Sequence, residues 1–205
     1  SESPLTKSTV FVVDDDQAMR NSLKWLIESV GVRVESFASA DEFLAGYQPG
    51  RSGCLVLDVR MPGMSGLDLQ EYLVEHNIQI PAVIITGHGD VPMAVRAVQA
   101  GASDFIEKPF RDQVLLDSVH RAITQDAESR GEASRIADIE KRLARLTPRE
   151  REVLELVMAG DRNKVIASRL GVSQSTVEAH RAKVMEKMEA KTLSDLMRMA
   201  LTITR

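Results

Sequence analysis

Short apolar runs alternate with amphipathic segments through the first 125 residues of the chain. The apolar runs lie at residues 10–13, 33–37, 54–57, 82–85 and 105–106. Segments with apolar residues at helical spacing lie between and after them, at residues 17–29, 40–46, 67–76, 91–100 and 112–123. Apolar strands that alternate with amphipathic helices are typical of βαβ units. The pattern therefore predicts an α/β domain over residues 1–124, with a doubly wound, five-stranded parallel sheet.

The last 60 residues show only short helical segments. The sequence TPRE at 147–150 is a helix start, with threonine as N-cap, proline at the first position and glutamate at N3. A short helix over 164–170 then ends at a glycine, and a longer one begins after a serine and spans 173–188. A short helix, a tight turn with glycine and a longer helix form the helix-turn-helix pattern. A fourth helix over 192–204 completes a predicted all-α domain over 145–205.

Residues 125–144 connect the two predicted domains and are mostly polar. Three apolar residues there and one just beyond follow the three-four spacing of an a/d seam: Ile136, Ile139, Leu143 and Leu146. The segment is then either a continuation of the helix over 112–123 that helps the chain to dimerise, or a solvated linker with a short amphipathic patch. Two heptads are marginally stable alone, so the spacing leaves both open.

Charge is distributed unevenly along the chain. Residues 1–125 carry 10 Lys and Arg against 17 Asp and Glu, whereas residues 145–205 carry 12 against 8. An acidic N-terminal part and a basic C-terminal part indicate that the two parts have different partners. The surplus of basic residues in the C-terminal part permits binding to nucleic acid. No apolar run approaches the roughly 20 residues that span a bilayer, so we expect no membrane partner. Cys54 is the single cysteine, which excludes an internal disulfide and fits the reducing cytoplasm.

Side chains with distinctive chemistry follow four of the predicted strands. Asp14 and Asp15 follow the first strand, Asp58 the third, Thr86 the fourth and Lys108 the fifth. Ligands of a doubly wound sheet bind beyond the carboxyl ends of its strands. Each side chain alone could be a helix cap, a strand end or a solvated charge, but all five fall at strand ends in order. The set predicts a site for Mg²⁺, or Mn²⁺ in its place, with an aspartate poised to attack a phosphoryl group.

Three acids stand side by side at residues 14–16. Repulsion between neighbouring carboxylates requires a counter-charge or shifted pKa values. We expect Asp14 and Asp15 to share the cation, with Asp15 as the more direct ligand. Asp16 should point the other way and cap the helix that starts near Gln17.

Four motifs of the first domain are shared with a known family. They are "VVDDD", "LVLDVRMPGMSG", "IITGHGD" and "FIEKPF". On these motifs, over about 120 residues, the chain resembles the flavodoxin-like receiver domain of two-component response regulators. The resemblance implies that Asp58 is the phospho-acceptor. It also implies that Asp14, Asp15 and Asp58 bind the metal together with the backbone carbonyl of Arg60.

The same resemblance implies a switch. Thr86 would turn towards the phosphoryl group, and Lys108 would pair with that group. Phe105 would rotate into the space that Thr86 vacates. We expect this to remodel the face made by the helix over 91–100 and the fifth strand, and the receiver to dimerise through it.

The basic half resembles the LuxR-type DNA-binding domain. The segments "LTPREREVLELVMAG", "NKVIASRLGVSQSTVEAHRAKVMEKM" and "AKTLSDLMRMAL" carry this likeness. Together the two halves look like the NarL/FixJ class, and most like FixJ-type regulators. Val177, Val184 and Met188 share an inner stripe of the recognition helix. The expected DNA-facing residues are Lys164, Gln174, Ser175, Thr176, Glu178, Ala179, Arg181, Ala182, Lys183 and Lys187.

The resemblance implies a transcription regulator rather than an enzyme, with slow autodephosphorylation only. A sensor histidine kinase, promoter DNA, RNA polymerase and a second copy of the chain would be its partners. One alternative is a DNA-binding regulator with a vestigial receiver, which the intact set of acids, Thr86 and Lys108 disfavours. Another is a Mg²⁺-dependent aspartyl-phosphate enzyme. Such enzymes need an acid/base carboxylate two residues past the nucleophile, where this chain has Arg60.

Overall fold

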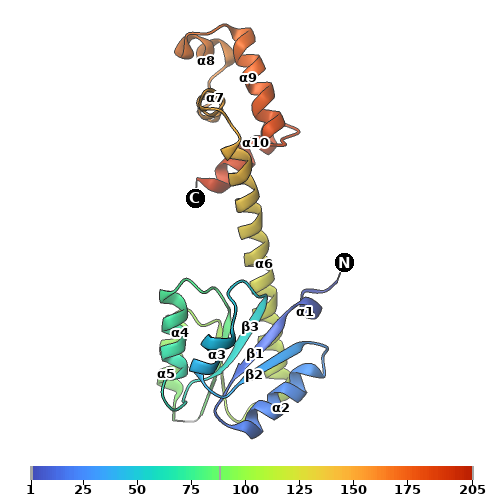
Figure 1. Ribbon diagram of the computed structural model, residues 1–205, viewed down its shortest axis with the longest axis vertical. Helices are drawn as coiled ribbons and strands as arrows, with labels where there is room; N and C mark the ends of the chain where they lie inside the picture. The colour runs from blue at the N-terminus through green and yellow to red at the C-terminus, as the bar shows by residue number, and fades with distance from the viewer. Residues whose placement is uncertain (1, 88, 205) are drawn as a thin grey trace. The chain divides into compact units, whose positions relative to one another are not determined.

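The computed structural model describes residues 2–87 and 89–204, which divide into compact units over residues 1–130 and 131–205 (Figure 1). The first unit contains a five-stranded parallel sheet in the order β2-β1-β3-β4-β5. Its strands are β1 Thr9–Val13, β2 Arg33–Phe37, β3 Gly53–Asp58, β4 Ala82–Thr86 and β5 Asp104–Glu107. The predicted doubly wound parallel sheet is thereby confirmed.

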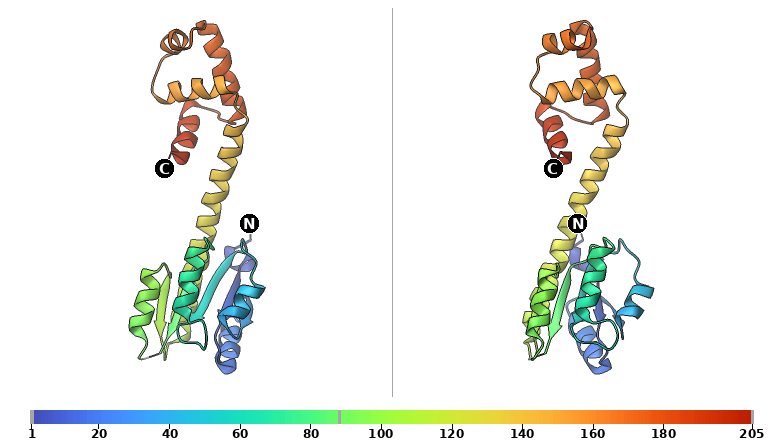
Figure 2. Two further views of the ribbon diagram at one scale, coloured as in Figure 1. Left: turned by 60° about the vertical axis from the view of Figure 1, so that its left-hand side comes forward. Right: turned by 90° about the vertical axis from the view of Figure 1, so that its left-hand side faces the viewer.

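Helices cover both faces of the sheet (Figure 2). They are α1 Pro4–Lys7, α2 Gln17–Glu28, α3 Ala40–Gly46, α4 Gly66–Glu75, α5 Val91–Gln99 and α6 Asp112–Ala144. Alternate side chains of β1 enter two cores: Phe11 lies in the core under α3, α4 and α5, and Val12 lies in the core under α2 and α6. All five residues of β1 are buried, so the apolar run marks a central strand. None of the described helices is long and apolar enough to cross a membrane.

The helix α6 is anchored to the first unit beyond the predicted domain boundary at residue 124. The Asp126 side chain is 4% exposed and accepts hydrogen bonds from the Gly53 N–H at 2.9 Å and from Arg130 Nε at 2.8 Å. Arg130 also donates to the carbonyls of Gly50, at 2.7 Å, and Arg51. This cluster, the α6 anchor, fixes the helix to the loop before β3.

The second unit contains the end of α6 and four further helices. These are α7 Pro148–Met158, α8 Asn163–Leu170, α9 Gln174–Lys187 and α10 Leu193–Ile203. The predicted start of α7 is confirmed, because the side chains of Thr147 and Glu150 form a reciprocal capping box. The four-helix arrangement agrees with the prediction from the helix spacing.

The seam of residues 136–146 is used within the chain. Ile139 and Leu146 are 4% and 7% exposed and lie in one core with Met188, the C-cap residue of α9, and Leu196 of α10. Residues 112–144 form one continuous helix, and Gly131 does not interrupt it. Leu143 packs against the same core, so three of the four a/d positions are covered by helices of the second unit itself rather than left for a second copy of the chain.

Candidate functional site

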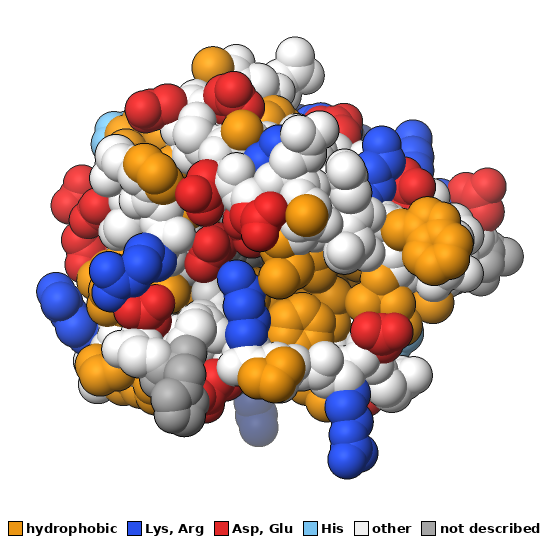
Figure 3. All heavy atoms as spheres, turned by 90° about the horizontal axis from the view of Figure 1, so that it is seen from below, with side chains coloured by type: hydrophobic (Ala, Val, Ile, Leu, Met, Phe, Trp, Pro, Cys, Tyr) orange, Lys and Arg blue, Asp and Glu red, His pale blue; other side chains and the backbone are white. Residues whose placement is uncertain are grey.

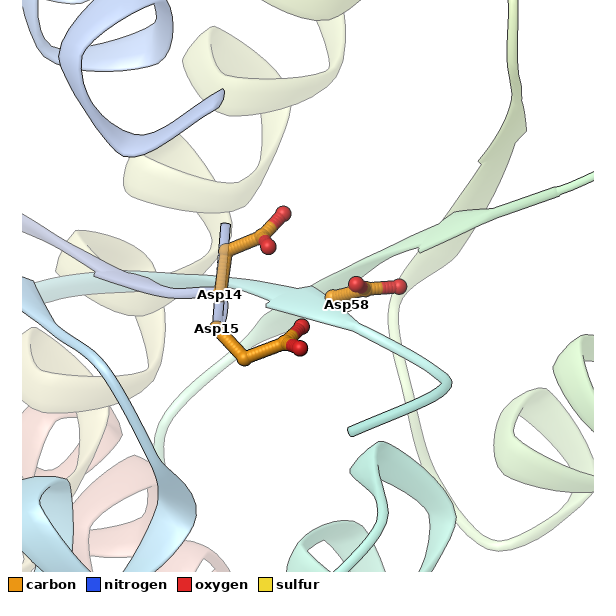
Figure 4. Close-up of side chains that lie close together, drawn as sticks. All are labelled: Asp14, Asp15 and Asp58. Atoms are coloured by element: carbon orange, nitrogen blue, oxygen red, sulfur yellow. The ribbon is translucent and has the colours of Figure 1, made fainter. Parts of the chain in front are cut away.

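The acidic side chains of the first unit meet at the carboxyl ends of adjacent strands. Asp14 and Asp15 follow β1, and Asp58 is the last residue of β3, its neighbour in the sheet. One carboxylate oxygen from each of the three lies within 4.8 Å of the others. Figure 4 shows the three carboxylates turned to the same side of the strand ends, and Figure 3 looks onto this end, where acidic, basic and apolar side chains gather. The sequence therefore placed these acids correctly in space.

Burial sets the electrostatics of this acidic rim. Desolvation raises the pKa of Asp58 to about 6, with the negative charge of Asp14 as the next cause, while Lys108 acts in the opposite direction. Desolvation likewise raises the pKa of Asp14, which is 1% exposed. Asp14 Oδ1 accepts the Asp16 N–H at 2.9 Å, but none of the described residues donates a hydrogen bond to its buried Oδ2. The rim therefore carries more negative charge than its protein surroundings compensate.

Asp16 is not part of the rim. Its carboxylate accepts the Ala18 N–H at 2.9 Å and the Met19 N–H at 3.5 Å, and so caps α2. Asp14 and Asp15 thus cluster with Asp58, whereas Asp16 caps a helix, as the sequence predicted for the third acid. Asp16 occupies its position because α2 needs an N-cap, and not because it shares a ligand with the other two acids.

The neutral and basic members of the set lie on the neighbouring strands β4 and β5. Thr86 is fully buried, and its hydroxyl donates to the Gly87 carbonyl at 3.2 Å. Lys108 follows β5, its backbone N–H donates to the Thr86 carbonyl at 2.8 Å, and its bond to Pro109 is cis. Phe105 is half-buried against the core that contains β4. The residues expected to respond to a phosphoryl group thus lie on two hydrogen-bonded strands.

Arg60 joins the acidic rim to the next loop, which the sequence did not predict. Its backbone N–H donates to Asp58 Oδ1 at 3.3 Å. Its guanidinium donates to Asp90 Oδ1, at 3.0 Å from Nε. Asp90 directly precedes α5, and the contact spans 30 residues of sequence, so no local pattern could reveal it.

In the second unit, α8 and α9 form the helix-turn-helix. Gly171 ends α8 with φ of +67°, a left-handed conformation that glycine adopts without strain. The Ser173 hydroxyl accepts the Thr176 N–H at 3.2 Å and caps α9. Val177, Val184 and Met188 are at most 2% exposed, as the inner stripe predicts. The opposite side of α9 is therefore free to meet another molecule.

The predicted DNA-facing residues fall into two groups. Seven are exposed: Lys164, Gln174, Ser175, Glu178, Ala179, Ala182 and Lys183. Three are half-buried: Thr176, Arg181 and Lys187.

Two of the half-buried residues have partners within the domain that sequence reasoning missed. Arg181 Nη1 donates to Asn163 Oδ1 at 2.6 Å, and Lys187 Nζ donates to both carboxylate oxygens of Glu150 at 2.8 Å. These bonds orient the cations from neighbouring helices. The helical spacing of α9 carries no signal for them, because the partners lie on α8 and α7.

Known protein families match both domains of the chain. The family model of the response regulator receiver domain matches residues 10–120, and that of the LuxR family of bacterial regulatory proteins matches residues 144–200. The chain is 50% identical over 198 residues to nodulation protein W of Bradyrhizobium diazoefficiens, covering 97% of this chain and 87% of that protein. It is 48% identical to the transcriptional regulatory protein FixJ of Rhizobium meliloti, covering 96% of this chain and 97% of that protein.

Solved structures show the same likeness. The response regulator StyR matches with a TM-score of 0.87 and 45% identity, over 95% of this chain and 98% of that one. Full-length FixJ from B. japonicum matches with a TM-score of 0.60 and 44% identity, over 97% and 98% of the two chains. A receiver domain implies a histidine kinase as partner and acidic residues that bind Mg²⁺, and a LuxR-type domain implies DNA. The chain therefore belongs to the two-component response regulators, as a FixJ-like transcriptional regulator with a receiver domain and a LuxR-type DNA-binding domain.

Proposed function

We propose that Asp58 accepts a phosphoryl group from a sensor histidine kinase, and that this modification controls promoter binding by the second domain. The observation that carries the proposal is the position of the Asp58 carboxylate. It stands at the end of a central strand, half-buried, within 4.8 Å of the carboxylates of Asp14 and Asp15. A nucleophile beside two further acids at a strand end suits phosphoryl transfer better than a structural role, because the fold gains nothing from their repulsion.

The ionised carboxylate of Asp58 is the nucleophile. One of its oxygens bonds to phosphorus while the phosphorus–nitrogen bond to the donor histidine breaks, and that electron pair stays with the imidazole. Because burial raises the pKa of Asp58, the carboxylate needs positive charge nearby to remain ionised at neutral pH. Lys108 supplies part of that charge and would hold an oxygen of the transferred group.

The residues present fit a hard divalent cation. Asp14, Asp15 and Asp58 would hold Mg²⁺, with the backbone carbonyl of Arg60 as a fourth protein ligand, and Mn²⁺ would suit the same oxygens. The buried Asp14 Oδ2, which receives no hydrogen bond from the described residues, supports this fit. When bound, the cation supplies charge neutralisation for the acids and for the phosphoryl group.

Phosphorylation reaches the surface through Thr86. Its hydroxyl leaves the Gly87 carbonyl for a phosphoryl oxygen, and Phe105 moves into the space that this creates. The surface over α5 and β5 then changes. Val95 and Val98, which are 40% and 37% exposed on α5, provide apolar area there for a second receiver, so the phosphorylated chain dimerises through this surface.

The exposed side of α9 reads DNA. Arg181, Lys183 and Lys187 provide phosphate or guanine contacts, Glu178 can accept from cytosine N4, and Ala179 can touch a thymine methyl group. One such domain buries little surface, so a dimer on two half-sites gives the affinity that a monomer lacks. The protein acts in the cytoplasm, where a promoter-bound regulator also meets RNA polymerase. Slow hydrolysis of the aspartyl phosphate ends the signal.

The test uses the full chain, Mg²⁺ and either acetyl phosphate or beryllofluoride. Treatment should double the mass measured by light scattering and tighten binding to a duplex selected from a random pool on the treated chain. Asp58→Asn should lose both responses. Asp16→Asn is the matched control, because asparagine also caps a helix, and it should respond like the wild type.

Two outcomes would contradict the proposal. A full response of Asp58→Asn would remove that residue as acceptor. Equal DNA binding by the treated and untreated chain would favour a regulator that does not depend on phosphorylation.

A further inference from the structure

The Arg60 side chain bridges two loops that border the acceptor. Arg60 lies two residues after Asp58, in the loop between β3 and α4, and its guanidinium contacts Asp90 before α5. The Arg60 side chain is 71% exposed, whereas that of Asp90 is 15% exposed. The cation can therefore move into solvent or towards the acceptor, while the carboxylate is confined. We call this contact the Arg60–Asp90 pair.

Asp90 occupies a capping position without capping. It is the N-cap residue of α5, yet its carboxylate makes no hydrogen bond to the described N–H groups of the helix. Two other helices that begin at rim loops are capped by side chains, α2 by Asp16 and α4 by Ser65. Aspartate is among the strongest N-caps, but the Asp90 backbone, with φ of −110° and ψ of 7°, is outside the extended conformation of a capping residue, and its carboxylate has a competing partner. In this structure that partner is Arg60.

The acceptor offers Arg60 a better partner once it is modified. The Arg60 N–H already lies 3.3 Å from Asp58 Oδ1, so the residue is anchored beside the acceptor. A phosphoryl group brings about −1.5 to −2 charges and three acceptor oxygens, against the single charge of Asp90. The planar guanidinium binds phosphate through two parallel hydrogen bonds.

We propose that Arg60 exchanges Asp90 for the phosphoryl group on Asp58, and that the released Asp90 carboxylate then caps α5. This inference rests on the proposed phosphorylation of Asp58. Pro92 at the second helical position has no N–H, so the freed carboxylate is directed to the N–H of Met93. That N–H donates to the Asp90 carbonyl at 3.0 Å in this structure, as does the Ala94 N–H at 3.1 Å, so capping transfers the Met93 donor from the carbonyl to the carboxylate. The exchange gives the acceptor a second connection to α5, separate from that through Thr86 and Phe105. Arg60 is thereby a positioning residue for α5 through its side chain.

A double-mutant cycle on the full chain tests the exchange. The measured quantity is the dissociation constant for beryllofluoride with Mg²⁺, for the wild type, Asp90→Asn, Arg60→Gln and the double variant. Asparagine keeps a capping side chain but removes the charge that holds Arg60. Asp90→Asn should therefore tighten beryllofluoride binding about two- to fivefold, the range expected for a surface ion pair. In the Arg60→Gln background the same substitution should have no effect, because there is no cation to release.

A spectroscopic measurement reports the second half of the exchange. In Asp90→Asn the amide proton of Met93 should already lie downfield without beryllofluoride, because the asparagine side chain is not held by Arg60 and can cap the helix from the start. In the wild type the same proton should move downfield only when beryllofluoride is added. It should not do so in Asp90→Ala, which has no side chain to cap with. Glu35→Gln is the control, since it breaks the Arg51–Glu35 pair near the amino end of β3 and should change neither readout.

The proposal is overturned if Asp90→Asn binds beryllofluoride as the wild type does, or if it tightens binding equally when Arg60 is glutamine. An unchanged Met93 amide in the wild type also overturns it, and this result needs no variant to fold. Failure of the proposed function looks different, because Asp58→Asn would then still bind beryllofluoride.

Discussion

The two units treat their buried acids in opposite ways. In the receiver unit, burial and the neighbouring acid outweigh Lys108, so the pKa of Asp58 rises to about 6. In the DNA-binding unit, the Glu150 side chain is only 7% exposed, but Lys187 donates to both of its oxygens and holds its pKa below the usual range. The receiver unit keeps partly uncompensated negative charge at its strand ends, whereas the DNA-binding unit compensates the charge of Glu150 with Lys187.

This difference gives the two units opposite responses to pH. A raised pKa means that the folded receiver binds more protons than the unfolded chain between about pH 4 and 6. The contribution of Asp58 to stability is therefore present below pH 4 and lost as the pH rises through about 6. The lowered pKa of Glu150 has the reverse sign, so its contribution is present at neutral pH and lost in acid.

The largest expected effect tests the compensated acid. Glu150→Ala should lower the free energy of unfolding of the second unit by about 2 kcal/mol, because it removes half of the capping box and leaves Lys187 partly buried without its partner. Glu152→Ala is the matched control, since its pair with Arg149 is exposed on both sides. Chemical denaturation measures both, and equal effects would show that Glu150 is an ordinary surface acid.

The uncompensated acid should behave in the opposite way. Asp58→Asn should raise the free energy of unfolding of the metal-free chain at pH 7 by about 1–2 kcal/mol, and flatten the fall in stability between pH 4 and 6. Mg²⁺ should stabilise the wild type more than this variant. Thermal unfolding at several pH values, with and without Mg²⁺, measures these effects. A variant less stable than the wild type at pH 7 would contradict the comparison.

Two substitutions among the adjacent acids distinguish a carboxylate that binds the cation, Asp15, from one that caps a helix, Asp16. Asp15→Ala should weaken Mg²⁺ binding at least about tenfold, as expected for loss of a direct ligand. Asp16→Ala should leave Mg²⁺ affinity nearly unchanged but cost about 1 kcal/mol of stability, because it removes the cap of α2. Titration calorimetry combined with denaturation separates the two. Similar losses of Mg²⁺ affinity would remove the distinction.

The smallest effect concerns the exposed side of the second unit. Arg181→Ala should weaken DNA binding for all sequences and reduce the slope of log affinity against log salt by about one. Arg135→Ala on α6, where the side chain pairs with Glu132, should leave the slope as it is. An unchanged slope for Arg181→Ala would mean that Asn163 keeps this cation away from phosphate.

Local patterns carried most of the fold and the acidic rim. The helix of residues 40–46 and the strand of residues 33–37 have the predicted bounds, and the acids converge because parallel strands end at one edge. Helix α1 was missed, since four residues are too few to show a period. The strand β5 is longer than its two-residue apolar run because Asp104 and Glu107 complete the pairing with β4.

Contacts between polar residues that are far apart in the chain could not be predicted from the sequence. The Arg60–Asp90 pair joins positions 30 apart, and the Lys187–Glu150 pair joins positions 37 apart. The apolar periodicity of α9 predicts that Lys187 faces solvent, because it contains no information about Glu150 on α7. The periodicity of a segment indicates which face of that helix or strand is buried, but it carries no signal for polar contacts between two elements.

The α6 anchor decides where the chain can be cut. A receiver fragment that ends at residue 124 would lack Asp126 and Arg130. The N–H of Gly53 would then lose its carboxylate partner, and two loop carbonyls would lose the guanidinium. A fragment that ends after residue 130 keeps these bonds and should melt at a higher temperature. The nearly three turns of helix between the end of the family match at residue 120 and residue 130 are therefore part of the receiver's own architecture. A chimera that carries a different output domain should be joined after them.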